Sequence, residues 1–297
     1  MRAPLVRLVT LICAIGVAAQ LLAQPEQQAK TEAQSSAQAS IIPVGETGLA
    51  LLKQGQFPQA IKDLQRAVQQ EPGSWRYSLG LAEALLSSNY NFTGLRFLLE
   101  IKPRFQNLAE YHYALGLAYY LSYQYPEAIK EFKTFPQNDP KLNRIPYLIG
   151  NCYMAMSDLK EASVYFRKAI ELNPTEASYY LALGKMLRME GPQHFEEAIS
   201  VLQKALKLKP QDPYIRLHLA YCELGENHYK DAQALLEQLV RDQPDFQPGH
   251  LALASVYEHY HDWSKARQQR DIAAHLNPPK QTFDPRIGPV ASTVAPH

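Results

Sequence analysis

Three histidines near the C-terminal end, His250, His259 and His261, are the residues whose spacing first suggests chemistry. Neutral imidazole is a common zinc ligand, and a zinc site needs three or four ligands that converge on one point. His259 and His261 are two residues apart, and side chains at that spacing on a helix point in different directions. No cysteine or carboxylate stands at ligand spacing beside them. The pattern therefore predicts solvated histidines at a helix end and no metal site.

Catalytic motifs of other kinds are absent from the sequence. It contains no glycine-rich phosphate loop and no nucleophile elbow, so we expect no catalytic residue, no cofactor and no enzyme. Lys plus Arg number 30 and Asp plus Glu 29, whereas a nucleic-acid-binding protein usually has a basic surplus. We therefore do not expect nucleic acid as a partner. Recognition of a protein or peptide remains, and 18 tyrosines could provide its contacts.

The elements that would carry such side chains follow from a period of 34 residues. Units begin at Ile41, Trp75, Ala109, Asn143, Ala177, Pro213 and Gln247. The eighth residue of each unit is Gly or Ala, and so is the twentieth, once a two-residue insertion in the fifth unit is counted. Two antiparallel helices joined by a short turn approach closely where such small residues lie at their crossing point. Each unit is thus predicted to be a helical hairpin.

The second helix of each unit carries an apolar stripe at three- and four-residue spacing, as in Ala162, Phe166 and Ala169. One hairpin cannot bury this stripe, so neighbouring units must stack. A proline at position 32 is expected to end the second helix, because its ring and missing N–H stop a helix. These prolines are Pro72, Pro140, Pro174, Pro210, Pro244 and Pro278.

Small residues at positions 8 and 20, apolar residues at 11, 24 and 27, and proline at 32 resemble the tetratricopeptide repeat (TPR) family; the unit 143–176 is a good example. The resemblance covers residues 41–280. It implies an all-α fold, a right-handed α-solenoid of seven helix-turn-helix repeats that binds other proteins. The repeats are 41–74, 75–108, 109–142, 143–176, 177–212, 213–246 and 247–280.

Three units depart from the pattern. The second lacks proline at position 32 and has Pro103 instead, so its second helix is predicted to stop after Glu100 or Ile101. The insertion in the fifth unit, residues 191–194, is expected to form a protruding loop. Arg270 replaces an apolar residue in the seventh unit, and a polar last helix suits the end of the array.

In proteins that this chain resembles, the first helix of each repeat lines a concave groove. Positions 2, 5, 9 and 12 share one helix face, which predicts an aromatic groove wall with a basic centre. An extended peptide, in particular an acidic one, would suit this lining. The alternative is that the tyrosines only fill space between adjacent first helices. The predicted groove residues are Tyr113, Leu117, Tyr120, Arg144, Tyr147, Asn151, Leu181, Lys185, Arg188, Tyr214, Leu217 and Tyr221.

Some TPR proteins clamp the acidic tail of a chaperone with a lysine at position 5 and an asparagine at position 9. No unit here has lysine at position 5, and Asn151 and Lys185 are only fragments of that pattern, so the clamp is not expected. Cys152 and Cys222 both stand at position 10 of nonadjacent units. They are predicted to be core thiols, too far apart for a disulfide.

The N-terminal residues 1–23 resemble an export signal, with Arg2 and Arg7 before an apolar run and small residues at Ala19 and Ala23 as alternative cleavage positions. An uncleaved membrane anchor is the alternative, and only then is membrane contact expected. Residues 24–40 are predicted to be a disordered linker and residues 281–297 a disordered tail. We therefore expect an exported protein, periplasmic or secreted, that acts in envelope assembly or secretion. The alternative is an accessory subunit that holds an apoprotein for an envelope enzyme system such as cytochrome maturation.

Overall fold

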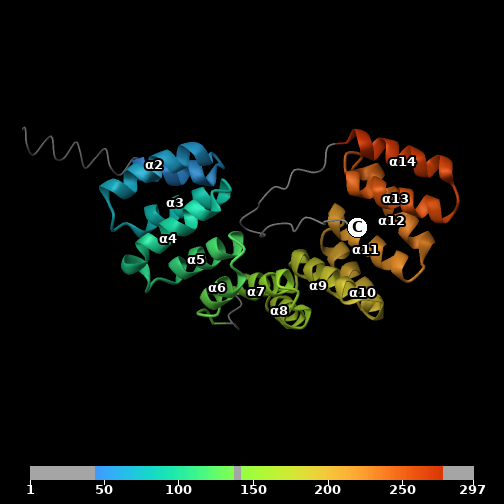
Figure 1. The fold of residues 1–297 in the computed structure, drawn as a ribbon, viewed down its shortest axis with the longest axis horizontal. Helices are drawn as coiled ribbons and strands as arrows, with labels where there is room; N and C mark the ends of the chain where they lie inside the picture. The colour runs from blue at the N-terminus through green and yellow to red at the C-terminus, as the bar shows by residue number, and fades with distance from the viewer. Residues whose placement is uncertain (1–43, 137–141, 277–297) are drawn as a thin grey trace, which may run out of the picture. The chain divides into compact units, whose positions relative to one another are not determined.

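A computed structural model describes residues 44–136 and 142–276, and these residues are helices joined by short turns, without a strand (Figure 1). The predicted signal sequence, linker and tail lie outside the described residues. Within the described ranges, no helix combines the length and apolar character needed to cross a bilayer. The chain divides into two compact units, Met1–Asn89 and Tyr90–His297.

The first unit contains a helix over residues 44–53, followed by α2 (Phe57–Gln70) and α3 (Trp75–Ser87). Leu64 of α2 is fully buried at the centre of this unit. A Cβ added at Gly48 would lie 2.8 Å from Leu64 Cγ, and one at Gly80 would lie 2.6 Å from Leu49 Cδ2. The glycines therefore let the helices approach more closely than any side chain would allow.

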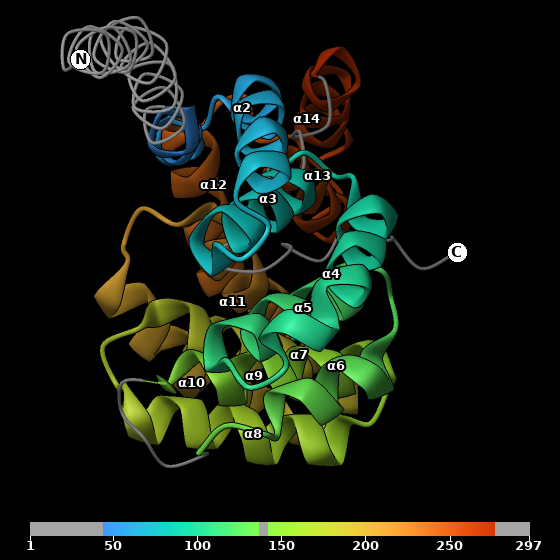
Figure 2. The ribbon, with the colours of Figure 1, turned by 90° about the vertical axis from the view of Figure 1, so that its left-hand side faces the viewer.

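The second unit is a succession of helical hairpins in which each helix packs on the next (Figures 1 and 2). The first helices of neighbouring hairpins also touch, α7 with α9, α9 with α11, and α11 with α13. The helices are α4 (Asn91–Phe105), α5 (Ala109–Leu121), α6 (Tyr125–Phe132), α7 (Arg144–Ala155), α8 (Leu159–Leu172), α9 (Ala177–Glu190), α10 (Phe195–Leu208), α11 (Pro213–Gly225), α12 (Tyr229–Asp242), α13 (Gln247–His259) and α14 (Trp263–His275).

The glycine at position 8 makes room for the large residue at position 24 of the same hairpin. A Cβ on Gly150 would lie 2.7 Å from Phe166 Cδ1, and one on Gly184 would lie 2.5 Å from Leu202 Cγ. Phe166 and Leu202 are both fully buried, so neither side chain can move into solvent. A small residue is required at this position because a large core side chain lies directly opposite it.

Four helix ends follow the predicted proline rule. The helices α2, α8, α10 and α12 each end two residues before a proline at position 32, namely Pro72, Pro174, Pro210 and Pro244. The residue before a proline is disfavoured in helical conformation, which accounts for the two-residue offset.

The prediction was wrong for the third hairpin, where α6 ends at Phe132 rather than near Pro140. Pro136 has no N–H to donate to the carbonyl of residue 132, and it disfavours the helical conformation of Phe135. Thr134 Oγ1 also donates to the carbonyl oxygen of Glu131, which satisfies a group at the helix end. The helix is therefore only 8 residues long.

The prediction was also wrong for α4, which continues through Pro103 to Phe105. A proline removes one helical hydrogen bond, and packing of the following turn compensates for that loss here. Ile101 and Phe105 are 2% and 5% exposed. The hydroxyl of Tyr111 donates to the carbonyl oxygen of Leu98 at 2.9 Å, which ties the same helix to α5.

The insertion at residues 191–194 forms a 3₁₀ turn, Pro192–His194, after Gly191 with a φ of 124°. That backbone conformation favours glycine. The inserted residues thus form a compact connection between α9 and α10.

Candidate functional site

The predicted groove residues of α5, α7, α9 and α11 fall into two groups by exposure. Five are buried: Leu117 (7%), Tyr120 (7%), Tyr147 (8%), Asn151 (6%) and Leu217 (1%). Seven are half-buried and reach solvent: Tyr113, Arg144, Leu181, Lys185, Arg188, Tyr214 and Tyr221. The second group presents most of the surface that a partner could touch.

Tyr147 shows what the buried aromatic residues do. Its ring centroid lies 4.9 Å from that of Tyr179 on α9 and 6.0 Å from that of Phe166 on α8. Burial raises the pKa of the Tyr147 hydroxyl, against an opposing hydrogen bond with Asn151. Tyr147 therefore fills the space between two neighbouring first helices, which is the alternative role considered above for the tyrosines.

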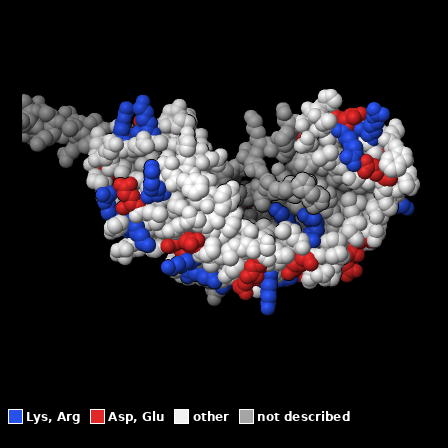
Figure 3. Space-filling model, in the orientation of Figure 1, with Lys and Arg blue, Asp and Glu red and all other residues white. Residues whose placement is uncertain are grey.

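Lys185 and Arg188 lie nearly one turn apart on α9 and form the basic centre of the surface. Desolvation lowers the pKa of the Lys185 ammonium, and the charge of Arg188 lowers it further. Figure 3 shows Lys and Arg side chains on the hollowed surface over α9 and α11. Within the described ranges, no ion pair involves either residue. The two charges are therefore partly desolvated and not neutralised by a neighbouring carboxylate.

Arg188 is held against α11 by an aromatic face. Its guanidinium carbon lies 5.5 Å from the ring centroid of Tyr221, a distance typical of a cation–π contact. Arg188 Nε is buried and has no hydrogen-bond partner in the described part of the chain. A planar guanidinium fixed in this way keeps N–H groups available for a ligand.

His218 on α11 adjoins this pair and was missed by the sequence analysis. The residue is 3% exposed, and its ring centroid lies 6.2 Å from that of Tyr221. Burial, and then the charges of Arg188 and Lys185, lower the pKa of His218 to about 3. Its Nδ1 atom is buried without a hydrogen-bond partner among the residues described. The imidazole is therefore neutral at physiological pH and beside two cations.

His218 stands at position 6 of its unit, outside the 2, 5, 9, 12 series used to predict the groove. The signal that could have revealed it is its spacing from Tyr221, because residues three apart share a helix face.

Arg144 on α7 adds a positive charge one hairpin before Lys185 and Arg188. This charge lowers the pKa of both Tyr147 and Tyr179, against the effect of burial. We call Arg144, Lys185, Arg188, His218 and Tyr221 the basic surface.

The histidines near the C-terminal end do not converge. The prediction of a solvated helix-end residue was wrong for His250, which is 4% exposed and lies on the inward face of α13. Its two ring nitrogens lie 2.7 Å from Gln269 Oε1 and 2.9 Å from the carbonyl oxygen of Pro244. His259 is exposed and stacks on Tyr229 with ring centroids 3.4 Å apart, and His261 is exposed as well.

A different cluster lies at the turn between α11 and α12. In the ranges the structure covers, ligand atoms of Glu223, His228 and Asp231 lie within 4.8 Å of one another. His228 Nδ1 is 2.9 Å from Glu223 Oε2, and this hydrogen bond raises the pKa of His228. An ion pair between these two residues explains the proximity without a metal.

Cys152 and Cys222 are buried and unpaired, as predicted. Burial raises the pKa of each thiol to about 12. A thiol with such a pKa is a poor nucleophile, so both cysteines act as small core residues.

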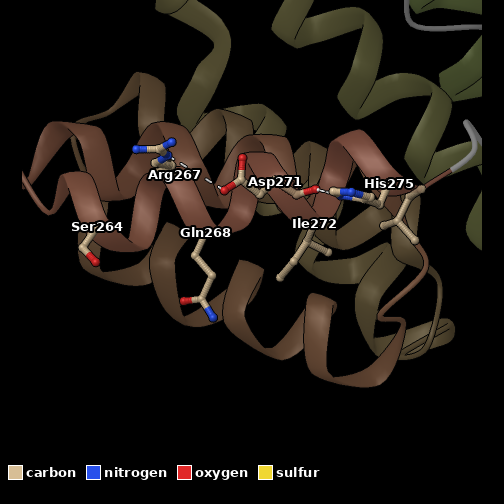
Figure 4. Close-up of a pocket in the computed structure, with 7 residues that line it drawn as sticks. Ser264, Arg267, Gln268, Asp271, Ile272 and His275 are labelled. Carbon is tan, nitrogen blue, oxygen red and sulfur yellow. Dashed lines mark hydrogen bonds and ion pairs between the residues drawn. The ribbon is translucent and has the colours of Figure 1, made fainter.

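A shallow depression follows the outer side of α14, the last described helix (Figure 4). All the residues that line it belong to α14 or its C-terminal end: Ser264, Arg267, Gln268, Asp271, Ile272, His275 and Leu276. A depression lined by one helix is an open flank rather than an enclosed site, and its charged residues are partly used within the helix. His275 Nδ1 lies 2.6 Å from the carbonyl oxygen of Asp271. The basic surface is the better candidate site.

Tetratricopeptide-repeat family models match residues 46–89, 147–176 and 192–256. The chain therefore contains tetratricopeptide repeats, a fold that generally serves as a scaffold for protein–protein interaction. Three relatives are similar over parts of the chain. Human DnaJ homolog subfamily C member 7 is 36% identical over 93 residues, which are 31% of this chain and 16% of that protein.

The Protein CTR9 homolog of Arabidopsis thaliana is 28% identical over 157 residues, 48% of this chain and 13% of that protein. The peroxisomal targeting signal receptor of Kluyveromyces lactis is 32% identical over 105 residues, 35% of this chain and 18% of that protein. The chain thus spans less than a fifth of the length of each relative, and the similarity concerns the repeats.

Solved structures agree with this fold. A tetratricopeptide repeat protein from Parabacteroides merdae superposes with a TM-score of 0.63 at 14% identity, covering 82% of this chain and 95% of that one. Pseudomonas aeruginosa pilF superposes with a TM-score of 0.60 at 18% identity, covering 76% and 98%. At these identities the likeness shows the fold alone, and it confirms the predicted all-α solenoid class.

Proposed function

We propose that this protein is a non-enzymatic scaffold that binds an extended segment of another protein along the basic surface. The observation that carries the proposal is the pair Lys185 and Arg188, two partly desolvated cations without an ion-pair partner among the described residues. Desolvating a charge is costly unless an opposite charge compensates, and a bound ligand can supply that charge.

The neighbouring side chains suit a peptide rather than a small molecule. Tyr214 and Tyr221 on α11 and Leu181 on α9 are half-buried, and Tyr221 contacts Arg188. Tyrosine combines rigid apolar area with a polar tip, and Arg and Tyr are the residue types that dominate binding energy at protein interfaces. An extended segment could cross α7, α9 and α11 and meet a charged or aromatic residue on each.

The proposal places this scaffold in envelope assembly or secretion, on the basis of the export signal expected at residues 1–23. The mass of the protein recovered from a periplasmic or secreted fraction tests the location. We expect a chain shortened by the residues up to Ala19 or Ala23. An unshortened chain confined to the cytosolic fraction would refute the location while leaving the binding proposal intact.

Site-specific photocrosslinking in the native host tests the binding surface. A photoreactive phenylalanine analogue at Leu181, one turn before Lys185, should give discrete crosslinked products with a protein partner. Val164 on α8 is 56% exposed and lies outside the basic surface, so the same analogue there is the matched control. Products of equal yield at both positions, or products only at Val164, would exclude this surface as the partner site.

A further inference from the structure

We propose that Lys185, Arg188 and His218 form a subsite that binds the side-chain carboxylate of an acidic residue in the partner segment. The inference rests on the proposed function and names the chemistry of the ligand at one point of it. It assigns His218 a specific role, the donation of an N–H to the bound carboxylate.

Lys185 and Arg188 differ from three other arginines of the second unit, each of which has a carboxylate partner. Arg216 pairs with Asp242 from α12, and Arg270 pairs with Glu258 from α13. Arg167 on the exposed side of α8 pairs with Glu197 from α10. Lys185 and Arg188 are more enclosed than Arg167 and have no such partner within the described chain. These three arginines thus have a carboxylate partner within the chain, whereas Lys185 and Arg188 have none among the described residues.

In the described part of the chain, two polar atoms of this subsite have no hydrogen-bond partner. Arg188 Nε and His218 Nδ1 are both buried and unsatisfied in the described residues. Folded proteins rarely leave buried polar atoms without a partner unless a ligand or water supplies one. A carboxylate offers two oxygens that accept from an Arg N–H and from the N–H of a neutral imidazole.

Among the charged groups around His218, Lys185 and Arg188 on α9 are the ones that lower its pKa. Carboxylates on the other elements packed nearby are engaged elsewhere, as three contacts show. Asp242 of α12 accepts from Arg216, Glu237 of α12 accepts from the Tyr257 hydroxyl, and Glu258 of α13 accepts from Arg270. His250 of α13 is bonded to Gln269 and to the backbone. Tyr221, on the same helix as His218, packs against the imidazole in a T-shaped arrangement.

The geometry favours a planar carboxylate. The Tyr221 ring lies 5.5 Å from the Arg188 guanidinium carbon, so a flat aromatic face helps to orient a flat cation before a ligand binds. Lys185 adds a point charge one turn earlier on α9, and His218 adds an N–H from α11. An acidic side chain could therefore interact with both first helices at once, which would fix its position along the groove.

Binding of a fluorescein-labelled octaglutamate peptide to the full chain, followed by anisotropy, tests the subsite. We expect saturable binding, and at least tenfold weaker binding for the double variant Lys185→Gln, Arg188→Gln. The variant His218→Gln should weaken binding by severalfold. The control is Lys204→Gln, Lys207→Gln, which removes two exposed charges from α10 and should leave the affinity unchanged. Equal losses for both double variants would show nonspecific attraction and overturn the proposal.

A measurement on the unmutated chain guards against variants that fold poorly. The imidazole resonances of His218 are followed by NMR while octaglutamate or, separately, octaglutamine is added. We expect octaglutamate alone to shift them and to raise the pH at which His218 titrates. Unchanged His218 resonances at saturating octaglutamate would refute the subsite. If crosslinks at Leu181 persist in that case, the binding surface survives; if they are also absent, both proposals fail.

Discussion

Replacing His218 with glutamine should flatten the dependence of stability on pH between pH 5 and pH 7. The pKa of His218 is about 3 in the folded chain, against 6.5 for an ordinary histidine. As the pH falls through 6.5, the unfolded chain takes up a proton at this residue, whereas the folded chain does not until the pH approaches 3. The unfolded state therefore binds more protons across this window, and stability falls as the pH falls.

The size of the effect follows from the two pKa values. A difference of one proton is worth about 1.4 kcal/mol per pH unit. Because proton uptake by the unfolded chain begins only near pH 6.5, the contribution lost between pH 7 and pH 5 is about 2 kcal/mol. Glutamine keeps a polar amide at the site but does not titrate. The variant should therefore lose about 2 kcal/mol less of its free energy of unfolding than the parent over the same interval.

Urea unfolding at pH 7, 6 and 5, followed by far-ultraviolet circular dichroism, measures this difference. Comparing the pH dependence of each chain, rather than its stability at one pH, removes the constant cost of the substitution itself. The variant His261→Gln, at an exposed helix end, controls for the loss of one imidazole. Parallel pH profiles for the parent and the His218 variant would refute the argument that this histidine is held neutral beside two cations.

Three further predictions concern the core. Gly150→Ala should destabilise the protein by about 1–2 kcal/mol in urea unfolding, because the clash with buried Phe166 outweighs the gain of about 0.5–1 kcal/mol from replacing a helical glycine; a gain in stability would contradict the close approach. Tyr111→Phe should cost about 1–2 kcal/mol in the same assay, since it leaves the carbonyl oxygen of Leu98 without its donor; an unchanged midpoint would mean that the bond contributes nothing. Iodoacetamide should modify the two buried cysteines only after unfolding, as judged by mass spectrometry, and rapid labelling of Cys152 or Cys222 in the native chain would exclude their burial.

The hairpin pattern was predictable because it depends on volumes that recur at fixed positions. In the hairpins with glycine at position 8, this residue meets the large one at position 24, as Gly150 meets Phe166 and Gly184 meets Leu202. Several predicted unit starts also coincide with the first residue of a helix, as Ala109 does in α5. A repeated constraint leaves a repeated signal, so the fold class could be derived from one sequence.

The helix ends that were predicted incorrectly depend on forces that a single proline does not reveal. Pro103 was expected to stop α4, but Ile101 and Phe105 gain enough from burial to carry the helix past it. Pro136 lies beyond the end of α6 and next to Phe135, a buried residue, and here the helix does stop early. The outcome in each case is decided by how the residues around the proline pack, which is tertiary information.

The charge of the candidate site could be predicted from the sequence, but the burial of its individual side chains could not. Positions on one helix face were taken to share one exposure, yet Tyr147 is buried against the next first helix while Lys185, on the corresponding face of α9, reaches solvent. A flat ring can enter the narrow space between two first helices. A lysine in that space would have to give up the hydration of its charge, so it stays at the surface unless an anion compensates.

The same reasoning explains why a histidine belongs at the centre of the basic surface. A third permanent cation beside Lys185 and Arg188 would add repulsion that no carboxylate in the described chain offsets. A purely apolar residue would leave an incoming acidic side chain without a donor from α11. Neutral His218 avoids the repulsion in the empty site and still offers an N–H, and once a carboxylate is bound it can accept a proton at low cost. Affinity for an acidic segment should therefore rise as the pH falls from 7 toward 5, where glutamate side chains remain mostly ionised, and an affinity that falls over this interval would argue against His218 as a ligand-binding residue.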